Sequence, residues 1–157
     1  LFNLPEDVQV FCNRGTSGFD GSVSTAVGAA YASELPTILI TGDLSLFYDS
    51  NGLWNAHIPK TFKIIVINNS GGGIFRILPG EKDTEVFDTF FETKHQLTAI
   101  DLARMYKFKY RAVTSENELE ASLQLFYEDA DGPAMLEIIT PDQVNDLVLL
   151  EYFKYIK

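Results

Sequence analysis

The segments TILITGDLS at residues 37–45 and IIVINNSGGG at residues 64–73 decide the fold of this chain. Each begins with a short apolar run rich in β-branched residues and ends in small polar residues. That pattern is typical of a buried strand followed by a turn. In a parallel sheet the carboxyl ends of neighbouring strands lie side by side and form a ligand-binding crevice. We therefore expect the two polar turns to face one crevice.

The side chains at these two turns suit a hard metal ion. Asp43 offers a carboxylate, Asn69 offers an amide oxygen, and the glycines that follow offer free backbone carbonyls. Oxygen ligands of this kind bind magnesium or calcium, and magnesium commonly completes its shell with water and phosphate oxygens. The sequence has no Lys or Arg between Gly15 and Pro59, so a phosphate bound here needs a metal and backbone N–H groups to balance its charge. Alternatively, both motifs are ordinary turns, because their residues favour turns in any case.

Size and charge restrict the class of protein. The 157 residues fit one domain, and a hydrophobic content of 46% can fill a sizeable core. The formal net charge of −10 argues against nucleic acid or an anionic membrane as a partner. Cys12 has no second cysteine to pair with, and we expect it to be a small buried hydrophobe in a reducing compartment. Neither a secretion signal nor a membrane-spanning apolar stretch is visible, which predicts a soluble, cytoplasmic protein without membrane insertion.

The rest of the pattern predicts strands that alternate with helices. We expect strands at residues 8–12, 37–41, 64–67, 110–113 and 134–139. We expect helices at residues 23–33, 46–57, 98–106 and 115–128, and a last helix that opens at Pro141. Trp54 is expected in the core, Thr98 as a helix cap, and Ser115 with Glu118 as a capping box. Residues 80–94 lack clear periodicity and are predicted to form a long loop or lid. This order predicts an α/β fold with an open, mainly parallel sheet and helices on both faces.

Two further features have both a structural and a functional interpretation. Arg14 is either a surface residue paired with a nearby carboxylate or a fork that binds a substrate carboxylate. Ile74 and Phe75 follow the glycine run directly, and they form either a buried short helix or an apolar wall for a substrate or cofactor. The two interpretations of Ile74 and Phe75 are compatible with each other.

Several short motifs together resemble one enzyme family. Gly-Asp followed at a distance by Asn-Asn resembles the thiamine-diphosphate motif, although Leu44 stands where the common form has a third glycine. The full set is similar to the family of 2-succinyl-5-enolpyruvyl-6-hydroxy-3-cyclohexene-1-carboxylate synthases of menaquinone biosynthesis. The motifs that carry this resemblance are Asn13-Arg14-Gly15, Gly18-Phe19-Asp20-Gly21, Ser24-Thr25-Ala26, Gly42-Asp43-Leu44-Ser45, Asn68-Asn69, Gly71-Gly72 and Ile74-Phe75.

The resemblance implies a reaction and the residues that serve it. Such enzymes bind thiamine diphosphate and Mg²⁺ or Mn²⁺, decarboxylate 2-oxoglutarate, and add the resulting succinic-semialdehyde carbanion to isochorismate. The metal ligands would be Asp43, Asn69 and the Gly71 carbonyl. The other cofactor contacts would be Ser17, Phe19, Gly42, Leu44, Ser45 and Gly72, with Phe19 supporting the bent cofactor. The substrate contacts would be Arg14, Ile74 and Phe75.

The resemblance also implies what this chain lacks. It would be a single diphosphate- and Mg-binding domain over residues 1–157, and a C-terminal fragment of a larger enzyme. The activating Glu would lie on a missing pyrimidine-binding domain, through which a homodimer or homotetramer forms, so the chain alone is expected to be inactive. Two alternatives remain open: a domain of another thiamine-diphosphate-dependent 2-oxo acid decarboxylase or synthase, and a non-catalytic metal- or nucleotide-binding module. The standard nucleotide motifs G-x-G-x-x-G and G-K-[ST] do not occur, which disfavours the module.

Overall fold

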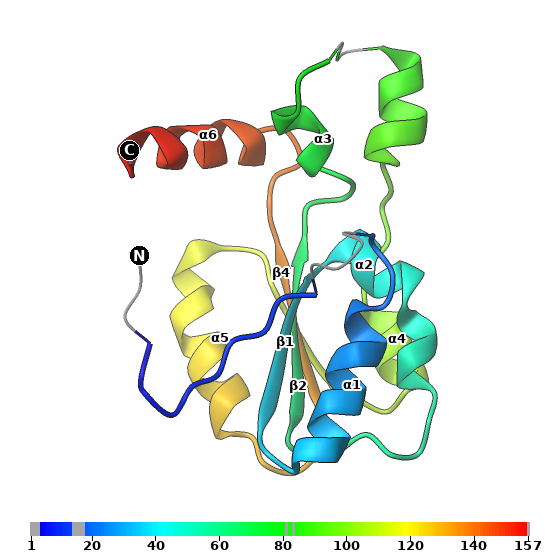
Figure 1. The fold of residues 1–157 in the computed structure, drawn as a ribbon, viewed down its shortest axis with the longest axis vertical. Coiled ribbons are helices and arrows are strands. Elements are labelled where there is room, and N and C mark those ends of the chain that lie inside the picture. The colour runs from blue at the N-terminus through cyan, green and yellow to red at the C-terminus, as the bar shows by residue number, and fades with distance from the viewer. Residues whose placement is uncertain (1–3, 14–17, 81, 83, 157) are drawn as a thin grey trace.

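One parallel sheet forms the centre of the computed structural model, which describes residues 4–13, 18–80, 82 and 84–156. Its strands are β1 (Thr37–Gly42), β2 (Phe62–Asn68), β3 (Lys109–Val113) and β4 (Ala134–Ile139), in the spatial order β1-β2-β4-β3. Every pair of neighbours is parallel, so each connection crosses a face of the sheet and carries helical segments there. The predicted α/β fold with helices on both faces is confirmed (Figure 1).

Strand β2 lies inside the sheet, and this explains its nearly continuous apolar sequence. Both of its faces are covered, and all of its residues except Ile67 are buried. The register places Gly42 of β1 opposite Ile67 and Asn68 opposite Ile139 of β4. The turns after β1 and β2 therefore leave the same edge of the sheet, as the sequence predicted.

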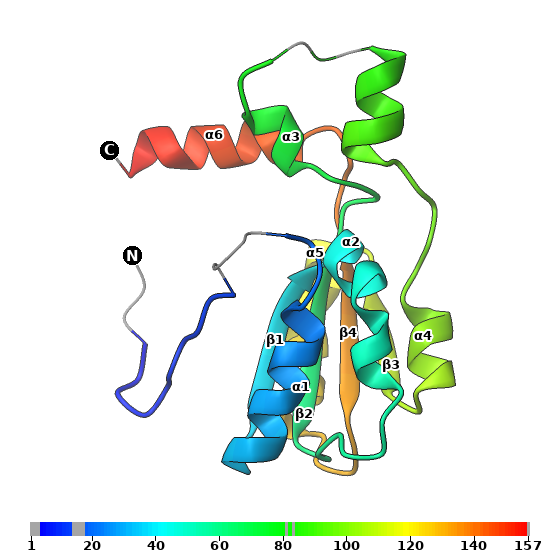
Figure 2. The ribbon, with the colours of Figure 1, turned by 45° about the vertical axis from the view of Figure 1, so that its right-hand side comes forward.

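The two faces of the sheet carry different helices. Helices α1 (Ser22–Ser33), α2 (Asp43–Tyr48) and α4 (Ile100–Met105), with the 3₁₀ turn η1 (Ser50–Leu53), cover one face (Figure 2). Helix α5 (Glu116–Glu128) covers the other face over β2, β3 and β4. The core on the α1 side is built from Val23, Val27, Ala30, Leu46, Leu53, Phe62, Ile64, Val66, Ala99, Ala103, Phe108 and Met135.

Three helical segments lie beyond the carboxyl edge of the sheet. They are α3 (Ile74–Ile77), the π-helical segment η2 (Phe87–Glu92) and α6 (Asn145–Tyr155), and they stand above the strands in Figure 1. The helix α6 packs against α3 and has no fully buried residue. Among the described helices none is both long and apolar enough to cross a lipid bilayer.

The predicted first strand at residues 8–12 is wrong. These residues join no ladder of the sheet, and the N–H of Val8 donates instead to the carbonyl of Pro5 at 3.0 Å. The two buried positions expected from apolar sequence are also wrong, because Cys12 is exposed and Trp54 is 75% exposed. An apolar run becomes a strand only where a neighbouring strand supplies hydrogen bonds, and the neighbour is a tertiary property.

Most helix positions are confirmed, but several ends differ. The stretch 46–57 is split between α2 and η1, and the last helix begins at Asn145 rather than at Pro141. The predicted loop 80–94 contains η2, and α4 follows Ala99 rather than a cap by Thr98. Ser115 precedes α5, but its side chain makes no capping hydrogen bond; the N–H of Glu118 donates to the Ser115 carbonyl at 3.2 Å. Helix ends depend on local bonds that a sequence pattern locates only to within a few residues.

Candidate functional site

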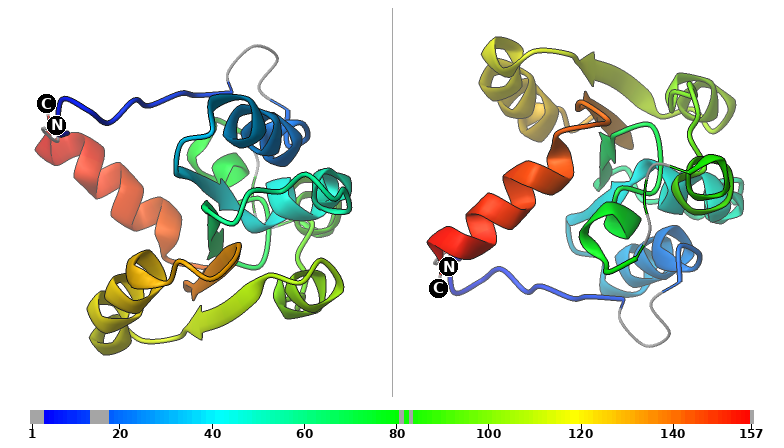
Figure 3. Two further views of the ribbon diagram at one scale, coloured as in Figure 1. Left: turned by 90° about the horizontal axis from the view of Figure 1, so that it is seen from below. Right: turned by 90° about the horizontal axis from the view of Figure 1, so that it is seen from above.

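A cavity of about 580 Å³ opens at the carboxyl edge of the sheet, between the turns after β1 and β2 and the helix α6. Figure 3 (right) looks down on this edge, where α6 begins near the end of β4 and extends away from the sheet. The residues that the sequence singled out and that line this cavity are Phe19, Gly42, Asp43, Leu44, Ser45, Asn69, Gly71, Gly72 and Ile74. Residues up to 55 positions apart therefore share one pocket, as the sequence predicted for the two turns.

The carboxylate of Asp43 joins the two turns. Asp43 is the first residue of α2, and 2% of its surface is exposed. It accepts hydrogen bonds from the N–H groups of Leu44 at 2.7 Å and of Gly71 at 3.1 Å. The buried charge is thus held by backbone N–H groups from both segments. This contact brings together the Gly-Asp and Asn-Asn motifs that are far apart in sequence.

The turn after β2 has an unusual backbone. Ser70 has a φ of 62°, in the left-handed region, and its N–H donates to Oδ1 of Asn68 at 3.0 Å. A Cβ on Gly71 would lie 2.7 Å from the carbonyl oxygen of Glu92, and one on Gly72 would lie 2.9 Å from that of Phe91. The glycines are required here because the segment 91–95 packs directly against the backbone of the turn.

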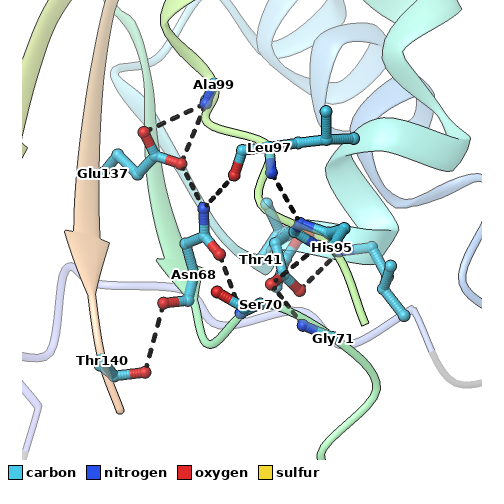
Figure 4. A network of polar contacts seen from close by, with 12 residues as sticks. Thr41, Asn68, Ser70, Gly71, His95, Leu97, Ala99, Glu137 and Thr140 are labelled. Atoms are coloured by element: carbon cyan, nitrogen blue, oxygen red, sulfur yellow. Dashed lines mark hydrogen bonds and ion pairs between the residues drawn. The ribbon is translucent and has the colours of Figure 1, made fainter. Parts of the chain in front are cut away.

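His95 belongs to the site, although no motif in the sequence pointed to it. Its N–H donates to the Ser70 carbonyl at 3.2 Å, and its Nδ1 accepts from the N–H of Leu97 at 3.1 Å. Its Nε2 is buried 3.3 Å from Oδ2 of Asp43, without a hydrogen bond to any described atom. The histidine reaches Asp43 because residues 91–99 run beside the turn after β2, which only the folded chain shows (Figure 4).

Aromatic side chains form one wall of the site. The ring of Phe19 stacks on Tyr48 at a centroid distance of 5.8 Å and meets the edge of Phe75 at 6.3 Å. Phe75 packs further against Phe91 at 5.6 Å. Ile74 lines the cavity directly, whereas Phe75 supports Phe19 from behind the lining. Ile74 and Phe75 form the short helix α3, but the predicted burial of this helix is wrong, because none of its residues is buried. The interpretation as part of an apolar wall agrees with the cavity lining at Ile74.

The C-terminal helix adds residues that sequence reasoning missed. The cavity is also lined by Thr140, which follows β4, and by five residues of α6: Asn145, Asp146, Val148, Leu149 and Tyr152. Asn145 donates from its side chain to Oγ1 of Thr140 at 3.0 Å, which ties the start of α6 to the end of β4. These residues lie far from both motifs in the sequence and belong to no motif of their own, so the sequence could not identify them.

The charged side chains among the described residues that line the cavity are carboxylates, those of Asp43 and Asp146. None of the described residues that line it is Lys or Arg, in agreement with the cation-free stretch in the sequence. The nearby Arg76 is committed to Glu92, with Nη2 donating to Oε2 at 2.7 Å. Arg14 and Ser17, which the sequence assigned to substrate and cofactor, lie outside the described residues.

The donors present fit a magnesium ion that arrives with a phosphate. In the described part of the chain no group of three or more His, Cys, Asp and Glu side chains could hold a metal. The oxygens that the sequence predicted as metal ligands, on the Asp43 carboxylate, the Asn69 amide and the Gly71 carbonyl, all belong to residues that line this cavity. Magnesium is commonly held by one or two carboxylates plus substrate phosphates, so this sparse oxygen set suits it.

Comparisons with known proteins agree with these residues. The family model described as thiamine pyrophosphate enzyme, C-terminal TPP binding domain, matches residues 2–138; thiamine pyrophosphate is another name for thiamine diphosphate. A protein of Christiangramia forsetii named 2-succinyl-5-enolpyruvyl-6-hydroxy-3-cyclohexene-1-carboxylate synthase is 54% identical over 157 residues, 100% of this chain and 27% of that protein. A protein of the same name from Flavobacterium psychrophilum is 58% identical over 154 residues, 98% of this chain and 28% of that protein. The chain thus spans little more than a quarter of these relatives.

Solved structures show the same fold. The thiamine diphosphate-dependent 4-hydroxybenzoylformate decarboxylase of Rhodococcus jostii RHA1 is 26% identical with a TM-score of 0.54, covering 74% of this chain and 22% of that one. The benzoylformate decarboxylase of Polynucleobacter necessarius is 16% identical with a TM-score of 0.52, covering 78% of this chain and 23% of that one. At that lower identity the likeness concerns the fold alone.

Proposed function

Because the chain belongs to the family of C-terminal thiamine pyrophosphate-binding domains, we propose that the cavity at the carboxyl edge of its sheet binds thiamine diphosphate together with Mg²⁺ or Mn²⁺. The observation that carries this proposal is the convergence of Asp43, Asn69 and Gly71 on one cavity without a described cation in its lining. A diphosphate carries several negative charges, and a divalent metal with backbone N–H groups can balance them.

Each residue of the site has a proposed role. Asp43, the side chain of Asn69 and the Gly71 carbonyl hold the metal. The hydroxyl of Ser45 binds the diphosphate, and the backbones of Leu44 and Gly72 lie beside it. Thiamine diphosphate supplies the electron sink for decarboxylation and carbon–carbon bond formation, so the protein's contribution is to bind and orient it. The further proposed contacts are Gly42, Ser17 and Phe19 for the cofactor, and Arg14, Ile74 and Phe75 for the substrate.

We propose further that residues 1–157 are the diphosphate-binding domain of a longer cytoplasmic 2-succinyl-5-enolpyruvyl-6-hydroxy-3-cyclohexene-1-carboxylate synthase. The support is the identity of 54% and 58% to relatives of that name. The substrates would be 2-oxoglutarate and isochorismate, and the product would enter menaquinone biosynthesis. The activating Glu would come from a pyrimidine-binding domain elsewhere in the longer protein, which assembles as a homodimer or homotetramer.

Calorimetry tests the cofactor proposal. Thiamine diphosphate is titrated into the longer protein with Mg²⁺ or with EDTA, and we expect binding only with the metal. The variant Asp43→Asn loses the charged ligand and should lose metal-dependent binding. Asp101→Asn is the control, because the side chain of Asp101 is 84% exposed and lies on α4, away from the cavity lining. Equal binding by both variants would contradict the assignment of Asp43.

A second candidate function is decarboxylation of a different 2-oxo acid. The 26% identity to the thiamine diphosphate-dependent 4-hydroxybenzoylformate decarboxylase is the observation that favours it. Assays of the longer protein with 2-oxoglutarate plus isochorismate, and separately with benzoylformate, distinguish the two. Carbon dioxide release from benzoylformate without turnover of 2-oxoglutarate would favour the second candidate.

A further inference from the structure

A buried carboxylate on β4 lies next to the candidate site without lining it. Glu137 has no exposed surface, and its oxygens accept hydrogen bonds from three donors on three other segments. Figure 4 shows the bonds from Asn68 and Ala99. Nδ2 of Asn68 donates at 2.7 Å, the N–H of Ala99 donates at 3.0 and 3.1 Å, and the hydroxyl of Tyr110 donates to Oε2. Burial, together with the bond to Glu137, raises the pKa of Tyr110, which keeps the hydroxyl a donor.

The carboxylate of Glu137 is one of three groups that fix which way the amide of Asn68 points. Nδ2 of Asn68 donates to Glu137 and to the Leu97 carbonyl at 3.0 Å, while Oδ1 accepts from the N–H of Ser70 at 3.0 Å. If the amide were reversed, its oxygen would face the carboxylate and its NH₂ group would face the Ser70 N–H. The contacts with Glu137, the Leu97 carbonyl and the Ser70 N–H would then all be repulsive, so the acceptor at position 137 contributes to selecting one orientation.

The orientation of this amide shapes the turn that carries the candidate ligands. The bond from Ser70 to Asn68 closes the turn at the residue whose φ is 62°, a conformation that costs energy for a residue with a side chain. Asn69 and Gly71 are the neighbours of Ser70 on either side, and the Gly71 N–H is thereby directed at Asp43. A change in the Asn68 amide therefore moves Ser70, and through Ser70 it moves the candidate ligands Asn69 and Gly71, which are bonded to Ser70 on either side.

We propose that Glu137 is a positioning residue for metal and diphosphate binding, acting through the side-chain amide of Asn68 on the turn 69–73. This inference rests on the proposed function, because the ligands that it positions are those assigned to thiamine diphosphate and its metal. It predicts that the chemistry of the side chain at 137 controls cofactor affinity although that side chain does not line the cavity. Partners behind direct metal ligands commonly change affinity about 10- to 100-fold when they are lost.

Three variants and one control test the proposal in the longer protein. Glu137→Met keeps the length of the side chain and removes the acceptor. Asn68→Asp keeps the acceptor for Ser70 and puts a second carboxylate against Glu137. Glu137→Gln restores one acceptor oxygen for Asn68. The matched control is Lys63→Met, which also replaces a buried charged residue by Met, but near the opposite end of β2, where Nζ of Lys63 donates to carbonyls at the end of α5.

We measure the dissociation constant of thiamine diphosphate at saturating Mg²⁺ and the thermal unfolding midpoint of each variant. Glu137→Met and Asn68→Asp should weaken binding about 10- to 100-fold, while Glu137→Gln stays within about threefold of the parent protein. Lys63→Met should lower the unfolding midpoint with less than about a twofold change in affinity, because Lys63 lies about 17 Å along the strand from Asn68. Wild-type affinity in both Glu137→Met and Asn68→Asp, or equal loss in Lys63→Met, would overturn the proposal.

A second measurement separates this inference from the proposed function. Hydrogen exchange at the Ser70 amide of the 157-residue chain reports the turn without any cofactor. Exchange at Ser70 should become at least about tenfold faster in Asn68→Asp and Glu137→Met than in Lys63→Met. If the parent protein bound no thiamine diphosphate, the proposed function would fail, and unchanged exchange at Ser70 would independently overturn the role of Glu137.

Discussion

Replacing Gly71 by alanine tests the close contact between the turn after β2 and the segment 91–95. Gly71 has a φ of 154°, and its N–H is donated to Asp43 at 3.1 Å. A Cβ at this position would lie 2.7 Å from the Glu92 carbonyl oxygen and 3.6 Å from Cα of Lys94. Both obstacles are backbone atoms, so a rotamer change cannot relieve the contact. Either the turn or the segment 91–95 has to move.

Two costs contribute to the expected loss of stability. A side chain in this sparsely populated backbone region costs about 1–3 kcal/mol. Insertion of a methyl group into a packed site costs about 1–3 kcal/mol more. The middle of the combined range, about 4 kcal/mol, is a large part of the roughly 5–15 kcal/mol that stabilises a domain. For a chain of this size it corresponds to a fall of about 8–16 °C in the unfolding midpoint.

Thermal and denaturant unfolding of the 157-residue chain measure this loss. Gly28→Ala is the matched control, because Gly28 is exposed within α1 and a Cβ there would meet nothing within 4 Å. We expect Gly28→Ala to stabilise the chain by about 0.5–1 kcal/mol, since alanine favours a helix over glycine. If Gly71→Ala unfolded within about 1 °C of the parent chain, the packing of residues 91–95 against the turn would be refuted.

Three further predictions concern the polar groups of the core and the site. The pKa of Tyr110 is raised in the folded state, so its contribution to stability is complete below the unfolded pKa of 10.0 and is lost as the pH rises above that value. Denaturant unfolding at pH 8 and at pH 11 should therefore show a smaller loss of unfolding free energy in Tyr110→Phe than in the parent chain. Lys63→Met removes the donor to the carbonyls of Phe126 and Tyr127 and should lower the unfolding free energy by about 1–3 kcal/mol. Urea unfolding at pH 7 measures this change, and an unchanged unfolding free energy would show that water replaces the lysine. Removing the metal with EDTA should release thiamine diphosphate from the longer protein, as followed by equilibrium dialysis, and Asp43→Asn should then bind equally poorly with and without metal.

The fold could be predicted from sequence where the signal was local. The β-branched runs before Gly42 and Asn68 defined β1 and β2, and the run 134–139 gave the bounds of β4. Strands buried on both faces require such runs, so pattern and structure agree. The run 8–12 shows the limit of this reasoning, because apolar residues without a neighbouring strand form no ladder. The exposed Trp54 shows the same limit for burial.

The site was predictable in part for the same reason. The Gly-Asp and Asn-Asn turns follow strands, and parallel strands bring such turns to one edge, where the structure places both in one cavity. His95 and Glu137 were not predictable, because each reaches the turn from a segment with no motif of its own. Asn145 and Tyr152 line the cavity because of the direction in which α6 leaves the end of β4, which the sequence does not specify.

The sequence by itself determined the layered α/β architecture and the oxygen-rich chemistry at the ends of β1 and β2. These properties follow from residue type and short-range periodicity, which act over a few neighbouring residues. The tertiary structure alone decided which way the Asn68 amide points, which histidine approaches Asp43, and which helix closes the cavity. Those contacts join residues from about 30 to more than 90 positions apart, and a contact of that kind exists only once the sheet has brought its strands together.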